Sequence, residues 1–126
     1  MAYQEHRGRH SFLKSVFFAI SGIAASFREK HIRIHYCIGA LVIVGGIFFR
    51  LTVTEWIFAL SCIAGVIALE MVNTAIERTV DLVTGEYHPL ARQAKDIAAG
   101  AVLIYSIYSV VVGFIIFGPK LLSLFY

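Results

Sequence analysis

Three long uncharged stretches most constrain what this chain can fold into. They cover residues 34–49, 56–69 and 97–118, and each begins directly after a charged residue. In hydrocarbon a segment must satisfy its own backbone hydrogen bonds, so such stretches cross a membrane as helices of about 20 residues. Hydrophobic residues make up 59% of the chain, more than in a soluble domain. The pattern predicts an all-α membrane protein.

We expect a single membrane-embedded domain that comprises residues 1–126. Its three predicted spans lie at about 31–49, 55–83 and 97–118. Capping and helix-breaking residues predict where these helices begin and end. Thr54 is the expected N-cap of the second span, Thr84 and Gly85 provide its C-cap and turn, and Pro119 ends the third span.

Residues 11–27 predict a shorter helix of another kind. Its large apolar residues take one side, and Ser, Gly and Lys14 take the other, which is typical of a helix lying in the membrane interface. Phe18 is the exception, because it falls among the polar residues. The pattern leaves two interpretations of Phe18 open, namely stacking on a nucleotide base and burial by a neighbouring helix.

The basic residues indicate how the chain crosses the membrane. Three spans place the N-terminus and the 84–96 connection on one side, which carries nine of the eleven Lys and Arg residues. They are Arg7, Arg9, Lys14, Arg28, Lys30, Arg33, Arg78, Arg92 and Lys95. The positive-inside rule makes this side cytoplasmic and the protein a multi-pass protein of the cell membrane. No basic stripe with interleaved aromatics is present, so nucleic-acid binding is not expected.

A row of polar residues begins inside the second span. Glu70, Asn73, Glu77 and Asp81 are spaced 3, 4 and 4 residues apart, so on a helix they share an arc of roughly 80° and rise about 16 Å. Glu70 follows the uncharged stretch directly and is expected in or close to hydrocarbon. An ionisable residue at that depth is by default a functional-site candidate.

The charged residues on the cytoplasmic side suit a magnesium–polyphosphate site. Carboxylates hold the hard cation and an ammonium group neutralises phosphate. The residues expected within reach of one another are Glu29, Glu77, Asp81, Glu86, His88, Lys95 and Asp96. Glu70, about two turns deeper than Glu77, is placed to take a proton from a lipid hydroxyl. His31 and His35 share a helix face, which suits metal binding as well as contacts to phosphate or a partner.

Two non-kinase interpretations use the same residues. In a trimeric membrane scaffold, Glu70 and Asn73 would form hydrogen bonds between helices. In an ion or proton carrier, the carboxylates would form a relay. The scaffold gives no role to Lys95, Asp96 and Glu29. The carrier would need acids on both sides of the bilayer midplane, and only Glu55 lies near the outer side.

The segment ALEMVNTAIERTVDLVTGEYHPLARQAKDIAAGAVLI, residues 68–104, closely resembles the central signature of the prokaryotic diacylglycerol kinase family. The resemblance extends over nearly the whole chain. It includes a Phe-x-Lys-Ser spacing at residues 12–15, an Ala-x-x-Gly spacing at residues 19–22, and Glu29 in the charged segment that precedes the first span. The resemblance implies a homotrimer whose subunits each have a surface helix and three spans. It also implies ATP-dependent phosphorylation of a membrane-lipid hydroxyl with Mg²⁺ as cofactor.

The resemblance also implies residue roles. Glu70 matches the proton acceptor, and Glu29 and Glu77 match the magnesium ligands that bridge to ATP. The matching nucleotide-binding residues are Lys14, Phe18, Glu29, Asn73, Glu77, Asp81, Glu86, Tyr87, His88, Lys95 and Asp96. The matching lipid-binding residues are Ser15, Ala19, Gly22, His31, His35 and Glu70.

Four features favour the Gram-positive branch of the family, whose members resemble undecaprenol kinases. They are His35, Trp56, the sequence HPLA at 88–91 and the sequence FGPK at 117–120. The apolar face of the 11–27 helix also offers few donors to the ester groups of a diacylglycerol. We therefore expect undecaprenol as the substrate, with diacylglycerol as the alternative.

Overall fold

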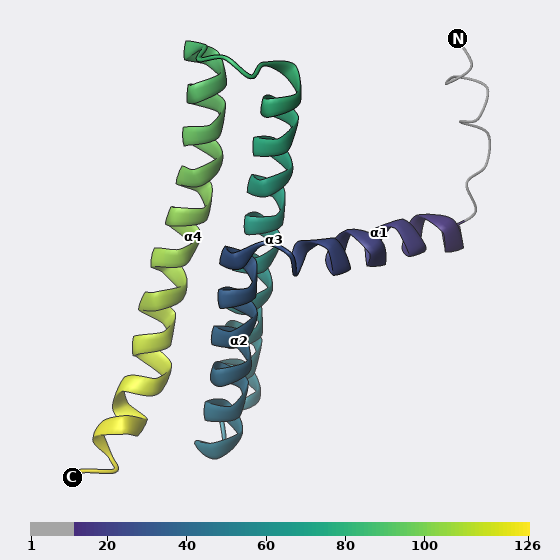
Figure 1. Cartoon of the computed structure of the whole chain (residues 1–126). Coiled ribbons are helices and arrows are strands. Elements are labelled where there is room, and N and C mark those ends of the chain that lie inside the picture. Colours follow the sequence, from purple (N-terminus) through teal and green to yellow (C-terminus); the bar gives the residue numbers. More distant parts are fainter. Residues whose placement is uncertain (1–11) are drawn as a thin grey trace.

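In the computed structural model, which describes residues 12–126, these residues form helices joined by short connections (Figure 1). The helices are α1 (Phe12–Ser26), α2 (Lys30–Phe48), α3 (Val53–Val83) and α4 (Pro89–Leu122). The last three are long and apolar enough to cross a membrane, and α1 is a shorter apolar helix. The predicted all-α class and three spans are confirmed. The predicted start of the surface helix at Ser11, and Arg7 and Arg9, lie outside the described residues.

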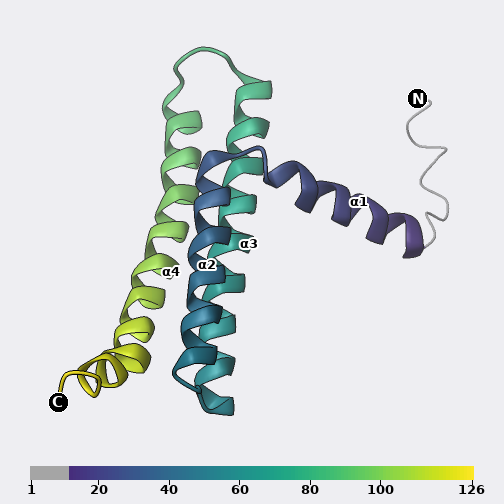
Figure 2. The same ribbon diagram turned by 60° about the horizontal axis from the view of Figure 1, so that its bottom comes forward.

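Helix α3 is the centre of the bundle. Helix α4 packs along α3, and α2 packs against α3 as well. Both views show α1 leaving the bundle sideways at the level where α2 begins, while α3 and α4 continue past that level to their connecting loop (Figures 1 and 2). At about 1.5 Å per residue, α3 is longer than the hydrocarbon core is thick. Its last turns therefore extend beyond the membrane if α1 lies in the interface.

The bundle of one chain buries little apolar surface. Leu51, Ala59 and Ile116 form a small core between α2, α3 and α4. Most large apolar side chains on the spans are exposed instead, such as Leu41 at 72% and Ile104 at 73%. In a membrane such faces contact lipid or another subunit, because lipid tails are as apolar as the side chains.

The connection from α2 to α3 is a tight turn. The N–H of Arg50 donates to the carbonyl of Ile47 at 3.2 Å, and the N–H of Leu51 donates to that of Gly46 at 3.1 Å. These two bonds form a Schellman motif, in which glycine usually takes the left-handed position. Here Arg50 takes it, with φ of 53°, a conformation that a side chain disfavours.

Thr52, not Thr54, caps the N-terminus of α3. Its hydroxyl accepts the N–H of Glu55 at 3.2 Å, and the Glu55 carboxylate accepts the N–H of Thr52 at 2.9 Å. The prediction for Thr54 was wrong, because only Thr52 has a glutamate three residues later and so forms a capping box. Lys120 also reaches Glu55, at 3.2 Å, and joins the end of α4 to the start of α3.

The loop between α3 and α4 has a cap at each end. Thr84 is the C-cap of α3, as predicted, and its hydroxyl accepts the N–H of Glu86 at 3.2 Å. His88 caps α4 through Nδ1, which accepts the N–H of Leu90 at 3.2 Å. Pro89 then takes the first helical position, where a missing N–H costs nothing. Helix α4 therefore begins at Pro89, well before the predicted span at 97.

Pro119 does not end α4, contrary to prediction. The helix continues to Leu122, and the carbonyl of Pro119 accepts the N–H of Ser123 at 3.0 Å. A proline removes one donor and crowds the preceding turn, which bends a helix without necessarily ending it. The last turns of α4 bend aside in Figure 2.

Candidate functional site

His35 and Glu70 form the innermost polar contact of the candidate site. His35 lies near the start of α2 and Glu70 in the middle of α3, and His35 Nε2 is 3.2 Å from Glu70 Oε1. The Glu70 side chain is only 14% exposed. The structure thus brings together the predicted proton acceptor and one predicted lipid-binding residue. A histidine at this distance fixes the orientation of the carboxylate.

The polar row continues along α3 from Glu70. Glu70, Asn73, Glu77 and Asp81 all lie on this uninterrupted helix, as predicted. Asn73 Nδ2 donates to Glu77 Oε1 at 3.3 Å. Asn73 Oδ1 is buried and has no hydrogen-bond partner among residues 12–126. A buried acceptor without a partner is uncommon in folded proteins, and it lies next to the predicted magnesium ligand Glu77.

Glu29 joins the hinge between α1 and α2 to α3. It is the N-cap residue of α2, yet its side chain makes no capping bond and instead accepts a hydrogen bond from Arg78. Arg78 directly follows Glu77 on α3, so this contact ties the hinge to the turn of α3 that carries the other predicted magnesium ligand. Sequence reasoning counted Arg78 only as a topology signal, because nothing in its spacing indicates a partner 49 residues away.

A polar cavity of about 240 Å³ lies at the loop end of the bundle. Five predicted nucleotide-binding residues line it, namely Asp81, Glu86, Tyr87, His88 and Lys95. Lys95 Nζ lies 2.6 Å from Asp81 Oδ1 and ties α4 to α3. Arg92, which was not among the predicted site residues, also lines the cavity. Its Nε is 3.1 Å from both carboxylate oxygens of Asp96. Basic and acidic side chains both line the cavity, which suits a phosphorylated ligand.

The predicted site residues on α1 lie apart from this cavity. Helix α1 projects from the bundle (Figures 1 and 2), and its residues that were predicted to bind nucleotide or lipid are exposed. They are Lys14, Ser15, Phe18, Ala19 and Gly22. One ring contact orients α1, since Phe27 stacks on Tyr36 of α2 with centroids 4.2 Å apart. His31 is exposed in the first turn of α2.

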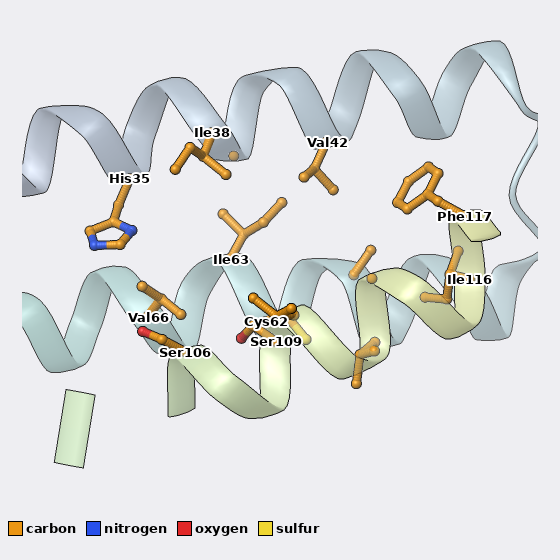
Figure 3. A pocket seen from close by; sticks show the side chains of 15 residues that line it. His35, Ile38, Val42, Cys62, Ile63, Val66, Ser106, Ser109, Ile116 and Phe117 are labelled. Atoms are coloured by element: carbon orange, nitrogen blue, oxygen red, sulfur yellow. The ribbon is translucent and has the colours of Figure 1, made fainter. Parts of the chain in front are cut away.

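An apolar cavity of about 320 Å³ begins at His35 and continues between α2, α3 and α4. Figure 3 shows His35 near one end and Ile116 and Phe117 near the other, with Ile38, Val42, Ile63 and Val66 between them. Ser106 and Ser109 are its polar residues besides the histidine. Glu70 therefore stands where an apolar cavity meets the polar end of the bundle.

The carboxylates fit a magnesium ion that is shared with a nucleotide. Within the described part of the chain, no group of three or more His, Cys, Asp or Glu residues is arranged to hold a metal ion. Mg²⁺ is usually bound by one or two carboxylates together with substrate phosphates and water, so a preformed cage is not required. Glu29 and Glu77 would supply hard oxygen donors, and Asn73, whose Oδ1 is buried without a partner, contacts Glu77.

Comparison with known proteins identifies a family that the chain matches. The family described as prokaryotic diacylglycerol kinase matches residues 17–117. The chain belongs to this family. Among its relatives, the undecaprenol kinase of Bacillus subtilis (strain 168) is 41% identical over 123 residues, which cover 96% of this chain and 100% of that protein. The diacylglycerol kinase of Synechocystis sp. is 42% identical over 118 residues, 90% of this chain and 66% of that protein.

Relatives of lower identity carry the name diacylglycerol kinase as well. The diacylglycerol kinase of Escherichia coli (strain K12) is 31% identical over 87 residues, 69% of this chain and 67% of that protein. The family and its Gram-positive undecaprenol kinase branch, both predicted from sequence, are therefore confirmed. The scaffold and carrier interpretations lose their support, because the relatives are kinases.

Proposed function

We propose that this protein is an ATP-dependent lipid kinase that phosphorylates the hydroxyl of undecaprenol to give undecaprenyl phosphate. The observation that carries the proposal is the place of Glu70. Along α3 it lies between Val66, which lines an apolar cavity that suits a lipid chain, and Asp81, which lines a polar cavity that suits phosphates. A near full-length relative named as an undecaprenol kinase supports this choice of lipid.

In the proposed reaction the lipid hydroxyl oxygen attacks the γ-phosphorus of ATP. The bond from that phosphorus to the bridging oxygen breaks, ADP leaves, and the hydroxyl proton passes to the Glu70 carboxylate. His35 holds that carboxylate in one orientation. Mg²⁺ bound by Glu29, Glu77 and the phosphates would neutralise charge on the transferred group. Lys95 and the 86–88 loop bind the nucleotide.

The proposed assembly is a homotrimer with its loop end and N-terminus in the cytoplasm. The exposed apolar faces of the spans are compatible with assembly, because another subunit can cover them as well as lipid can. The position of α1 supports shared sites. Helix α1, which carries Lys14 and Phe18, projects away from its own bundle, so these residues would serve the site of a neighbouring subunit. The cytoplasmic orientation is supported by the basic residues on that side.

Diacylglycerol is the second candidate substrate, since several relatives carry that name. The apolar cavity favours the prenol, because its only polar residues are His35, Ser106 and Ser109, and Ser109 already donates to the carbonyl of Tyr105 at 2.9 Å. A site that bound glycerol esters specifically would need more donors.

Transfer of labelled γ-phosphate tests the proposal. The purified protein in nanodiscs is given ATP labelled in the γ-position, Mg²⁺ and either undecaprenol or diacylglycerol, and the extracted lipids are separated. We expect label in undecaprenyl phosphate. Absence of label from both lipids, with protein that remains folded, would reject the kinase function. Label in phosphatidic acid alone would reject undecaprenol as the substrate.

A further inference from the structure

Arg78 is next to one predicted magnesium ligand in the sequence and contacts the other in the structure. It donates to the Glu29 carboxylate and follows Glu77 directly in α3. We propose that Arg78 is a phosphate-binding residue, which exchanges Glu29 for the nucleotide's phosphates when Mg²⁺ occupies that carboxylate. This inference rests on the proposed kinase function and adds a residue to its nucleotide site.

The position of Arg78 places it within reach of the phosphates. Mg²⁺ binds oxygen at about 2.1 Å, so phosphate oxygens on a magnesium ion held by Glu29 lie no more than about 4 Å from that carboxylate oxygen. The Arg78 guanidinium already touches the same oxygen, Oε1 of Glu29. A small rotation about the long side chain is enough to move it from carboxylate to phosphate. The planar guanidinium binds both anions with two parallel hydrogen bonds.

The charges of the site favour the exchange. In the structure Arg78 pairs with Glu29, Lys95 with Asp81 and Arg92 with Asp96. When Glu29 and Glu77 neutralise the two charges of a magnesium ion, Arg78 loses its anionic partner. The phosphates then offer the nearest negative charge. The existing pair is easily broken, because the side chains of Arg78 and Glu29 are 61% and 36% exposed and such surface pairs contribute little to stability.

Equilibrium binding of nucleotides separates this role from a purely structural one. The full protein in nanodiscs is titrated with ATP and with AMP at saturating Mg²⁺, as wild type, Arg78→Ala and Arg78→Lys. We expect Arg78→Ala to weaken ATP binding about tenfold and AMP binding less than twofold, because AMP lacks the β- and γ-phosphates. Lysine keeps the positive charge but cannot form the two parallel hydrogen bonds of a guanidinium. The ATP affinity of Arg78→Lys should therefore lie between those of wild type and Arg78→Ala. Arg33→Ala, which removes a cation from the exposed face of α2, is the control and should bind ATP like wild type.

A second measurement tests whether Arg78 only positions Glu29. The Mg²⁺ concentration for half-maximal binding is measured at saturating ATP for each variant. We expect no increase in Arg78→Ala, because the arginine competes with magnesium for Glu29. An increased requirement, an equal loss of ATP and AMP binding, or ATP binding like that of wild type would each overturn the inference. The kinase proposal is judged separately, by label transfer from the wild-type protein in the same nanodiscs.

Discussion

His35 Nε2 lies 3.2 Å from Glu70 Oε1, and this contact joins α2 to α3 where the apolar cavity begins. The two residues are 35 positions apart, and both are partly buried. A carboxylate that is shielded from water and fixed by one neighbour is suited to accept a proton in a defined direction. The first two predictions test this pair.

Glu70→Gln keeps the shape of the side chain and its contact to His35 but removes the base. We expect kcat to fall at least about 100-fold, with ATP affinity little changed. Steady-state label transfer and equilibrium nucleotide binding measure the two effects. Glu55→Gln, in the first turn of α3, is the control and should retain wild-type turnover. Near-normal turnover in Glu70→Gln would remove Glu70 from the chemistry.

His35→Gln tests whether the histidine orients Glu70. Glutamine can still donate to the carboxylate, whereas His35→Leu leaves Glu70 without that partner. We expect kcat to fall about tenfold in His35→Leu and less in His35→Gln, since misplacement of a catalytic group lowers the rate. ATP affinity should be unchanged in both. Equal activity of the leucine variant and wild type would limit His35 to a lining residue of the cavity.

Glu29→Gln tests the magnesium assignment. A neutral amide is a poorer ligand for a hard cation than a carboxylate. We expect the Mg²⁺ requirement to increase and ATP binding to weaken together, and the same pair of effects in Glu77→Gln. A magnesium titration of label transfer and of ATP binding measures both. If Glu29→Gln titrates with magnesium like wild type, Glu29 is a surface carboxylate that only pairs with Arg78.

Competition between lipids tests the choice of substrate. Undecaprenol and diacylglycerol are supplied in one micelle, and the ratio of their kcat/KM values is measured from the two labelled products. We expect the ratio to favour undecaprenol. A ratio favouring diacylglycerol by more than about tenfold, ~1.4 kcal/mol in transition-state binding, would reverse the preference and leave the kinase function intact.

Arg50→Gly should stabilise the fold. Arg50 has φ of 53°, and glycine adopts this conformation without the clash of a side chain. We expect a gain of about 1 kcal/mol, seen as a higher unfolding midpoint. Arg33→Gly, in the first turn of α2, should instead lower the midpoint, because glycine is a poor helix former. A lower midpoint for Arg50→Gly would show that the Arg50 side chain makes a stabilising contact.

The helices were predictable because their cause is local. Uncharged stretches, together with the polar and capping residues that flank them, placed α2 and α3 within a few residues. The spacing of Glu70, Asn73, Glu77 and Asp81 needed only that α3 be continuous. The wrong predictions concerned the ends of helices. Thr54 was preferred to Thr52 although only Thr52 completes a capping box, and Pro119 bends α4 instead of ending it.

The contacts between helices were harder to predict from the sequence. Several of the predicted nucleotide residues do line one cavity, because they flank one short loop. The pairing of His35 with Glu70 and of Glu29 with Arg78 depends on how α2 packs on α3, which no local pattern specifies. The roles predicted for Lys14, Phe18 and the other α1 residues stay predictions, since α1 projects away from the bundle.

The level at which α1 leaves the bundle also bears on the fate of the product. Glu70 contacts His35 near that level, so in the proposed function the hydroxyl reacts at the membrane surface while the lipid chain stays in hydrocarbon. The alcohol before the reaction is uncharged, whereas the phosphate after it carries negative charge. Because moving such a charge through hydrocarbon is costly, phosphorylation would confine the lipid to the leaflet in which it was made until another protein removes or transports it.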